Sequence, residues 1–371
     1  MRKVEFYRHS IGPEEIERVS GVLKSLFITT GAEVDLFERG LAGYLGLPHA
    51  VGVTSCTAAM HLALLAAGVG PGDEVVTTPM TFIGSANAVI MCGATPVLAD
   101  VDRATANIDP AAAEAAVTAR TKAILPVHLY GQMCDMESLR AVADRHGLAI
   151  VEDAAHSLEA SWNGKRPGHY GDYACFSFYA TKNITSGEGG AISAKDPEKN
   201  ELLRRLRLHG FDRTAMERYT GRFEQYDIKT FGWKYNMDNI HAAILVEQMK
   251  KLERMLARRR EIYRAYREAF EKMDGVELHS IRPEAEHACH IITLLVDPSM
   301  RDLVMDGMQK RGIGMSINFH PLHLMTYYRE KFGFRRGMFP VAEEIGARTI
   351  TIPFYPGLTD DEIEYVIESL R

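Results

Sequence analysis

Short apolar runs alternate with amphipathic helical segments through the first half of the chain. The runs predict strands at residues 50–55, 74–78, 95–101, 121–129 and 148–153, and the segments between them predict helices at 56–68, 81–93, 109–117 and 136–147. Such alternation is typical of a largely parallel sheet with helices on both faces. Two more predicted strands, 173–178 and 189–194, follow each other with almost no helix between them, so we expect a mixed sheet.

Helical and irregular segments flank this region. We expect residues 1–12 to form an arm that packs on another part of the chain. A basic helix predicted at 201–209 precedes residues 210–235, which show no periodicity, and an irregular segment of that length is usually functional or lies at an interface. A long helix is expected to begin after a cap at Asp238 and to end at Phe270. The basic residues in its middle are expected on a solvated face: Lys250, Lys251, Arg254, Arg258, Arg259 and Arg260.

A second strand and helix pattern follows Gly275. Strands are predicted at 290–296 and 314–319, and helices at 301–312, 341–349 and 360–370. We therefore expect an α/β protein with two domains. Residues 1–250 would form a large domain with a mostly parallel mixed sheet and an N-terminal arm, and residues 251–371 a small C-terminal α+β domain.

Composition narrows the class of protein. The 371 residues carry a formal net charge of −6, which gives no indication of binding to nucleic acid or to an anionic membrane. The five cysteines are scattered without a CxxC pair, as is typical of reduced thiols in a cytoplasm. The first residues lack the apolar core of a signal peptide, and no apolar run reaches the roughly 20 residues that span a bilayer. We expect a cytoplasmic enzyme.

The strongest chemical signal lies between Ile150 and Gly190. Asp153 ends one apolar run, and Lys182 follows a second, CFSFYA, just before the glycine-rich turn GEGG. An acid that can hold a ring nitrogen and a lysine that can form an imine suggest pyridoxal phosphate (PLP) chemistry. Alone, Asp153 could equally be a cap or turn residue, and Lys182 a surface lysine at a strand end. The glycines favour the functional interpretation, because they let backbone approach a flat ligand closely.

Other residues could complete such a site. Thr57 and Ala58 begin a predicted helix, where free backbone N–H groups bind phosphate, and Ser177 could add a hydroxyl. Phe82 follows the next strand, where its ring could stack on a cofactor. His156 comes one helical turn after Asp153 and could lie beside the ring. The alternatives are local capping, core packing and a structural histidine, respectively.

Two other chemistries are disfavoured. No GxGxxG follows an early strand, so a Rossmann dehydrogenase is not indicated. His320 and His323, like His287 and His290, are three residues apart, but Pro321 argues against a helix between the first pair. No set of carboxylates converges with either pair in the sequence, and we expect no metal site.

Taken together, these segments resemble the DegT/DnrJ/EryC1/StrS family of PLP-dependent aminotransferases that act on nucleotide-linked keto sugars. The resemblance covers almost the whole chain, and its specificity comes from the order and spacing of many motifs. They are FITTG (27–31), TSCTAAMHLAL (54–64), GPGDEVVTTPMTF (70–82), GATPVLADVD (93–102), RTKAILPVHLYGQ (120–132), VEDAAH (151–156), FSFYATKNITSGEGG (176–190), KYNMDNIHAAI (234–244) and HPLH (320–323).

The resemblance implies the type I fold of PLP-dependent transferases in a homodimer with shared active sites. Lys182 would form the imine with PLP and carry the proton, Asp153 would hold the pyridine nitrogen, and His156 would lie beside the ring. The phosphate would be held by Thr57, Ala58 and Ser177, with Asn236 reaching the cofactor of the neighbouring subunit and residues 210–235 approaching its site. Thr30 and His320 are candidates for substrate contacts.

The implied reaction moves an amino group from L-glutamate to a keto sugar on a nucleotide, at C4, and leaves 2-oxoglutarate. Family dehydratases carry histidine in place of the imine lysine, so Lys182 favours transamination. Ala32 and Ala180 stand where the family often has proline, and neither change removes a chemical group. VEDAAH and KYN resemble the branch that makes UDP-4-amino-4-deoxy-L-arabinose. The alternatives are a PLP-binding regulatory or sensory protein of the same fold and a structural α/β protein without a cofactor.

Overall fold

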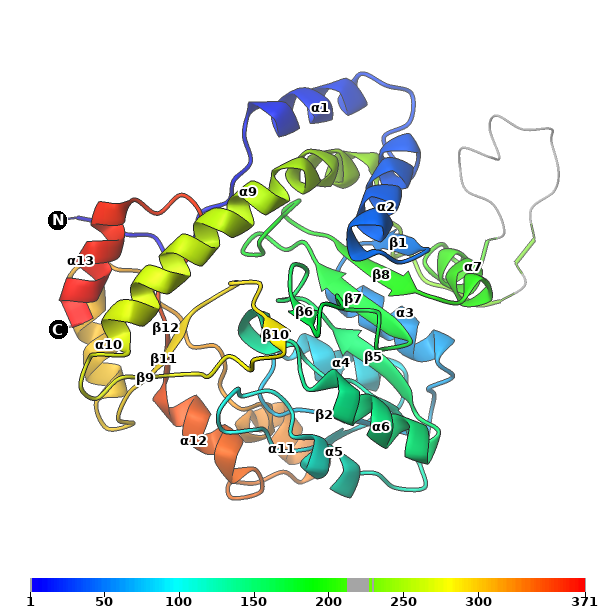
Figure 1. Ribbon diagram of the computed structural model, residues 1–371. Helices are drawn as coiled ribbons and strands as arrows, with labels where there is room; N and C mark the ends of the chain where they lie inside the picture. The colour runs from blue at the N-terminus through cyan, green and yellow to red at the C-terminus, as the bar shows by residue number, and fades with distance from the viewer. Residues whose placement is uncertain (1, 212–226, 229, 371) are drawn as a thin grey trace.

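The computed structural model describes residues 2–211, 227–228 and 230–370 of the protein (Figure 1). Its main sheet has seven strands in the order β1-β8-β7-β5-β4-β2-β3. Their bounds are Ala50–Val53 (β1), Glu74–Thr77 (β2), Thr95–Leu98 (β3), Thr121–Ile124 (β4), Ala149–Asp153 (β5), Tyr173–Ser177 (β7) and Gly190–Ala194 (β8). β3, β2, β4, β5 and β7 run parallel, whereas β8 is antiparallel to both β7 and β1. The mostly parallel mixed sheet expected from the sequence is confirmed.

Helices cover both faces of this sheet. Their bounds are Pro13–Leu23 (α1), Ala32–Leu45 (α2), Cys56–Ala66 (α3), Gly84–Met91 (α4), Pro110–Ala115 (α5), Met136–His146 (α6) and Pro197–Leu206 (α7). α3, α4 and α7 pack on one face with side chains such as Val75 and Ile192. α5 and α6 pack on the other with neighbours such as Val76 and Ile150, because successive strand residues point to opposite faces.

Aspartate caps fix several helix starts. Asp135 and Asp238 accept backbone N–H groups of the first turns of α6 and of α9 (Asn239–Phe270). The same chemistry corrects one prediction. The basic helix expected at 201–209 begins earlier, at Pro197, because Asp196 accepts the N–H groups of Glu198 and Lys199 and proline suits the first helical position.

The long helix α9 runs diagonally across the molecule in Figure 1, from α1 and α2 to the C-terminal helix α13 (Asp360–Leu370). The basic residues in its middle were predicted to lie on a solvated face, and for Arg259 this prediction is wrong. Arg259 is 3% exposed, and its guanidinium donates to the carbonyl oxygens of Cys289 and His290. Lys251 is also engaged, in ion pairs with Glu14 and the buried Glu15.

A smaller three-stranded sheet, β12-β11-β9, joins Thr349–Thr351, Thr293–Leu295 and Glu277–Leu278 in antiparallel pairs. The strand predicted at 314–319 is wrong, since this segment pairs with β12 only at Ser316. It then leaves the sheet and brings Asn318 and Phe319 to the main pocket. A two-stranded sheet joins β6 (Ser161–Trp162) to β10 (Ala285–Glu286).

The remaining helices are α10 (Arg301–Lys310), α11 (Thr326–Phe332) and α12 (Pro340–Arg348), with short 3-10 turns at Leu129–Gly131 and Leu322–Leu324. The N-terminal arm packs on another part of the chain, as expected. Val4 is fully buried in the core of the small sheet and pairs with Ile313. The domain boundary at residue 250 remains a prediction, and α9 spans it.

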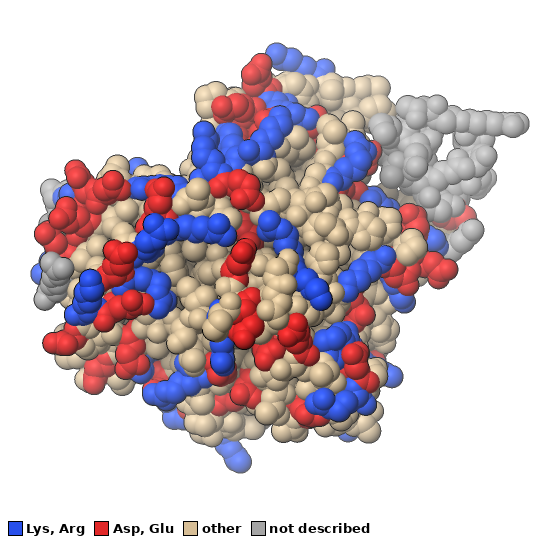
Figure 2. All heavy atoms as spheres, in the orientation of Figure 1, with Lys and Arg blue, Asp and Glu red and all other residues tan. Residues whose placement is uncertain are grey.

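Charges of both signs are interspersed over the face of the molecule that Figure 2 shows, without a broad patch of one sign. Within the described ranges, no helix is both long and apolar enough to cross a membrane. The irregular segment expected at 210–235 falls mostly on residues 212–226 and 229, which lie outside the described residues.

Candidate active site

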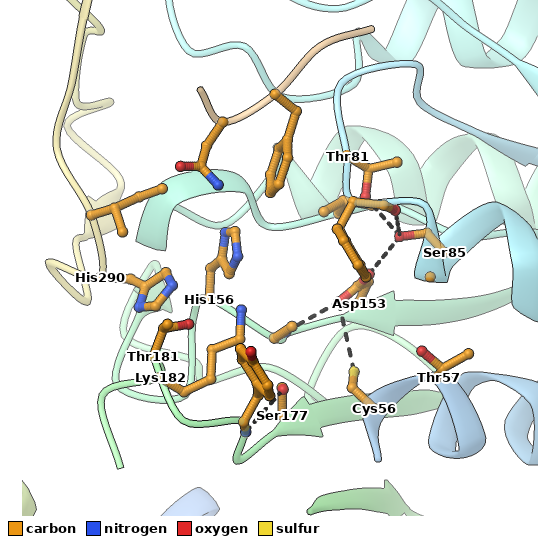
Figure 3. Close-up of a pocket in the computed structure, with 18 of the residues that line it drawn as sticks. Cys56, Thr57, Thr81, Ser85, Asp153, His156, Ser177, Thr181, Lys182 and His290 are labelled. Carbon is orange, nitrogen blue, oxygen red and sulfur yellow. Dashed lines mark hydrogen bonds between the residues drawn. The ribbon is translucent and has the colours of Figure 1, made fainter. Parts of the chain in front are cut away.

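A pocket of about 550 Å³ opens at the carboxyl ends of β5 and β7, where ligands bind in open α/β sheets. Figure 3 shows side chains from several elements meeting there. The sequence-predicted residues that line it are Thr57, Phe82, Asp153, His156, Ser177 and Lys182. Parallel strands end at one edge of the sheet, so the strand-end residues come together although they are distant in sequence.

The Asp153 carboxylate is held by three donors and pairs with no cation among the described residues. Its Oδ2 accepts the Ser85 hydroxyl at 2.7 Å, and its Oδ1 accepts the Ala155 N–H at 3.1 Å. The Cys56 thiol lies 3.8 Å from Oδ1. Burial and the Asp153 carboxylate raise the pKa of Cys56 well above its usual range, so this group stays a thiol and donates. Three donors suit an ionised carboxylate.

The Lys182 amine lies in the same pocket and points toward the imidazole of His156 in Figure 3. Burial lowers the pKa of Lys182 to about 8, against the opposing effects of Asp153 and Cys56. A neutral amine is therefore accessible near pH 8, which a nucleophilic lysine requires.

The start of α3 could hold an anion. Ser55 caps this helix by accepting the Ala58 N–H at 3.1 Å, so Ala58, which is buried outside the pocket lining, has a partner within the chain. Thr57 and Ser177 both line the pocket with their hydroxyls. A Cβ on Gly84 would lie 2.9 Å from Thr57 Oγ1, so glycine keeps this space open.

One glycine of the GEGG turn also lets two backbone segments approach each other. A Cβ on Gly190 would lie 2.3 Å from the carbonyl carbon of Ser55, so the glycine lets β8 approach the start of α3. Glu188 and Gly189 line the pocket, whereas Gly190 does not. The close approach is therefore between two backbone segments, and it positions the anion-binding end of the helix.

An aromatic wall closes another side of the pocket. Phe82 is 61% exposed although it is large and apolar, and its ring centroid lies 6.4 Å from that of Phe319. Tyr179 and Phe354 add further rings. An exposed ring in a pocket can stack on a flat ligand, which fits the interpretation of Phe82 as a cofactor contact better than core packing.

Besides Ala58, three more sequence-predicted residues, Thr30, Asn236 and His320, lie outside this pocket. Thr30 and Asn236 are buried next to each other: Asn236 Nδ2 donates to Thr30 Oγ1 at 2.7 Å, and Lys234 donates to Asn236 Oδ1. His320 is exposed, whereas His323 is buried against Glu343 at 2.9 Å. The part of the chain that the structure describes contains no group of side chains arranged to hold a metal ion.

Sequence reasoning missed Ser85, Cys56 and His290 as pocket residues. Cys56 had a usable signal, since it precedes Thr57 at the start of the same helix. Ser85 lies one turn after Thr81, but nothing in the local pattern shows that it reaches Asp153. His290 had been considered only as half of a metal-like pair with His287.

The donor set fits pyridoxal phosphate. The pocket combines an amine that can become neutral, a carboxylate without a cation for a protonated ring nitrogen, and an exposed ring at Phe82. It also contains a helix start with adjacent hydroxyls for a phosphate.

Comparison with known proteins agrees with this geometry. The family model of the DegT/DnrJ/EryC1/StrS aminotransferase family matches residues 9–371. The chain is 43% identical to the spore coat polysaccharide biosynthesis protein SpsC of Bacillus subtilis (strain 168), over 97% of this chain and 94% of that one.

Solved structures are similar over nearly the whole length. The putative sugar aminotransferase Spr1654 of Streptococcus pneumoniae in its PMP form has a TM-score of 0.94 and 32% identity, covering 99% of this chain and 98% of that one. DesV of S. venezuelae, in complex with a ketimine intermediate, has a TM-score of 0.89 and 36% identity, covering 96% and 93%. The predicted family and fold are confirmed: the chain belongs to the DegT/DnrJ/EryC1/StrS aminotransferase family.

Proposed function

We propose that this protein is a PLP-dependent aminotransferase that moves an amino group from L-glutamate to a keto sugar linked to a nucleotide, at C4 of the sugar. The observation that carries the proposal is that the Lys182 amine and the Asp153 carboxylate, which has no cation partner among the described residues, share one pocket. The sugar as acceptor is supported by the sugar aminotransferase from S. pneumoniae and the polysaccharide protein from B. subtilis. The nucleotide, the glutamate donor and the C4 position rest on the sequence resemblance.

Each pocket residue has a defined role in this proposal. Lys182 would hold the cofactor through its amine and, when released, would carry the proton that leaves or joins the substrate carbon. Asp153 holds the protonated pyridine nitrogen, and its three donors keep the carboxylate in place. Phe82 stacks on the ring and His156 lies beside it. When bound, the cofactor supplies the electron sink that makes a carbon–hydrogen bond of the substrate acidic.

The start of α3 would hold the phosphate. Thr57 and Ser177 donate hydroxyls, and backbone N–H groups there favour the anion. The Ala58 N–H now donates to the Ser55 hydroxyl. It would contribute to phosphate binding if the phosphate replaced Ser55 as the acceptor or shared the N–H with it. The aromatic wall around Phe319 and Phe354 limits the access of water to the reacting atoms.

The two substrates react in turn at this one site. Lys182 would take the α-proton of glutamate in the first half-reaction; the amino group would pass to the cofactor, and water would supply the keto oxygen of the 2-oxoglutarate that leaves. Lys182 would protonate the sugar carbon in the second. The protein contributes by orienting the bond that breaks and by keeping the proton on one group, the Lys182 amine.

We further propose a homodimer in which each subunit completes the other's site. Lys182 is the only lysine or arginine among the described residues that line the pocket, whereas both proposed substrates are anionic. Cations for their phosphates and carboxylates must come from outside this lining. Asn236 is held by Thr30 and Lys234 outside its own pocket and would serve the partner's cofactor.

A spectrophotometric half-reaction tests the function. The full-length protein is loaded with PMP and offered a panel of keto sugar nucleotides, and return of the visible PLP colour is the expected result for a 4-keto acceptor. L-glutamate should bleach the PLP form. Lys182→Ala should retain PMP but lose both colour changes. A protein that takes up PLP but is bleached by no amino donor would instead support a regulatory or sensory role, and turnover by Lys182→Ala would contradict the proposal.

A further inference from the structure

Two histidines face each other beside Lys182. The ring centroids of His156, which follows β5, and His290, which precedes β11, lie 4.3 Å apart at an interplanar angle of 36°. Both rings line the main pocket, and Figure 3 shows them with the Lys182 side chain reaching between this pair and Asp153. His290 has no part in the proposed function so far. Its hydrogen bonds, and those of His156, determine what each ring presents to the pocket.

The hydrogen-bonding role of His156 is fixed by a backbone group. The N–H of Tyr130 lies 3.3 Å from His156 Nδ1, and a backbone N–H can only donate. Nδ1 must therefore carry the lone pair, and the neutral ring carries its proton on Nε2. Tyr130, which donates this hydrogen bond, has a φ of 61°, a conformation that non-glycine residues seldom adopt.

The role of His290 is fixed in the opposite sense by Asn183, the residue after Lys182. The Asn183 amide nitrogen lies 2.9 Å from the carbonyl oxygen of Ala288 and 3.0 Å from Glu159 Oε2. A carbonyl only accepts, so this end of the amide is the NH₂ group and the other end is the oxygen. That oxygen lies 2.9 Å from His290 Nδ1, which must be the donor. The lone pair of a neutral His290 is therefore on Nε2.

Both rings are kept neutral by their surroundings. Burial holds the pKa of His156 well below its usual range, and Lys182 adds to this effect. Burial also holds the pKa of His290 well below its usual range, and the neighbouring His156, Lys182, Arg259 and His287 all act in the same direction. Glu159 and His290 are both hydrogen-bonded to the Asn183 amide, which donates to Glu159 and accepts from His290.

The pair thus carries one N–H donor, on Nε2 of His156, and one lone pair, on Nε2 of His290, and both residues line the pocket. The natural partner of the lone pair is a cationic N–H group, and Lys182 is the only lysine or arginine among the described lining residues. We propose that His290 is a positioning residue that accepts, through Nε2, a hydrogen bond from the protonated amine of Lys182. It holds that amine while the lysine is detached from the cofactor and carries a proton, so the inference rests on the proposed function.

The pKa of Lys182 in the full-length protein tests this proposal. Trace acetylation of the protein at a series of pH values, with and without PMP, followed by mass spectrometry, gives the midpoint at which Lys182 becomes reactive. The wild-type midpoint is expected near 8. His290→Asn keeps a donor near Asn183 but has no acceptor at the Nε2 position. Loss of a hydrogen bond to a charged group should lower the midpoint by about one pH unit.

Two further variants separate hydrogen bonding from packing. His290→Gln reaches the Nε2 position with an amide oxygen and should keep the midpoint near the wild-type value. His287→Asn makes the same exchange at a half-buried ring outside the main pocket, where Nδ1 accepts the Cys289 N–H at 2.9 Å, and should not shift the midpoint. Equal midpoints for the Asn and Gln variants of His290, or no shift in either, would overturn the proposal. Failure of the proposed function would appear separately, as absence of imine colour when wild type meets PLP.

Discussion

The Ser85 hydroxyl of α4 lies 2.7 Å from Oδ2 of Asp153 at the end of β5. Ser85 Oγ also lies 2.7 Å from the hydroxyl of Thr81. Because the carboxylate only accepts, Ser85 donates its single proton to Asp153, and Thr81 must donate to Ser85. The chain of two hydroxyls sets the orientation of the carboxylate relative to the ring nitrogen that it is proposed to hold.

Removal of the Ser85 hydroxyl should therefore slow proton abstraction without removing any group that touches the substrate. We expect Ser85→Ala to reduce the rate of the glutamate half-reaction about tenfold, since a hydrogen bond to a charged group contributes roughly 1.5–3 kcal/mol. Stopped-flow absorbance measures this rate. Ser85→Thr keeps the hydroxyl and should stay close to wild type. An alanine variant with an unchanged rate would show that Asp153 is oriented without Ser85.

Glu159 predicts a pH-dependent stability. It is 4% exposed, and burial raises its pKa to about 7, against the opposing effect of Arg259. The native state thus binds this proton more tightly than the unfolded chain, where the pKa is near the ordinary 4.5. Its contribution to stability is complete below that value and is lost as the pH rises through 7.

Glu159→Gln removes this charge but keeps an oxygen that can accept from Asn183. The difference in free energy of unfolding between variant and wild type should be about 2 kcal/mol more favourable to the variant at pH 8 than at pH 5. Urea titrations of both proteins at the two pH values give the difference. Glu137→Gln, at an exposed carboxylate, should show almost no such difference. A gain that is equal at both pH values would mean that the buried carboxylate is not the cause.

Gly190 is expected to be intolerant of a side chain. Its Cβ would lie 2.3 Å from the Ser55 carbonyl carbon and 2.6 Å from the Cys56 nitrogen, and neither backbone atom can move without displacing the start of α3. Gly190→Ala should lower the free energy of unfolding by about 3 kcal/mol and weaken PLP binding. Gly43→Ala lies inside α2, where a Cβ would meet no described atom within 4 Å apart from its own helix backbone and chain neighbours, and should instead stabilise by about 0.5–1 kcal/mol. Similar effects of the two changes would contradict the close approach.

Residues at strand ends were the part of the site that the sequence could place. Asp153 and Ser177 end buried strands and Lys182 follows one, and parallel strands bring such ends to one edge whatever the details of the loops. Phe82 and Thr57 followed from the same rule at the starts of helices. The order of strands and helices likewise predicted the mixed sheet.

What the sequence could not supply were contacts that depend on how distant segments approach each other. Ser85 donates to Asp153, which is 68 residues away in the sequence. Arg259 donates to the carbonyl of His290 from the middle of α9, where the sequence pattern predicted that basic side chains face solvent. Segment 314–319 has the apolar pattern of a strand but pairs only at Ser316, because it turns toward the pocket. Hydrophobic periodicity predicts apolar burial, whereas Ser85 and Arg259 are buried polar residues with hydrogen-bond partners.

Asn236 offers a test of the shared site. In its own chain it lies outside the main pocket and is held by Thr30, so its proposed contact with a cofactor requires a second subunit. Chains carrying Lys182→Ala and Asn236→Ala, each inactive alone, should form mixed dimers with one intact site. In that site, Lys182 comes from one chain and Asn236 from the other.

Purification of such dimers through two different tags should recover about half of the wild-type activity per dimer, as expected for two equivalent sites related by symmetry. Mixed dimers of Lys182→Ala and Asp153→Ala chains are the control. Both residues line the pocket of one chain, so each mixed dimer has one site without Lys182 and one without Asp153 and should stay inactive. Recovery in the first pairing alone identifies Asn236 as acting across the interface. An absence of recovery in both places Asn236 in its own chain, where its hydrogen bonds to Thr30 and Lys234 would be purely structural.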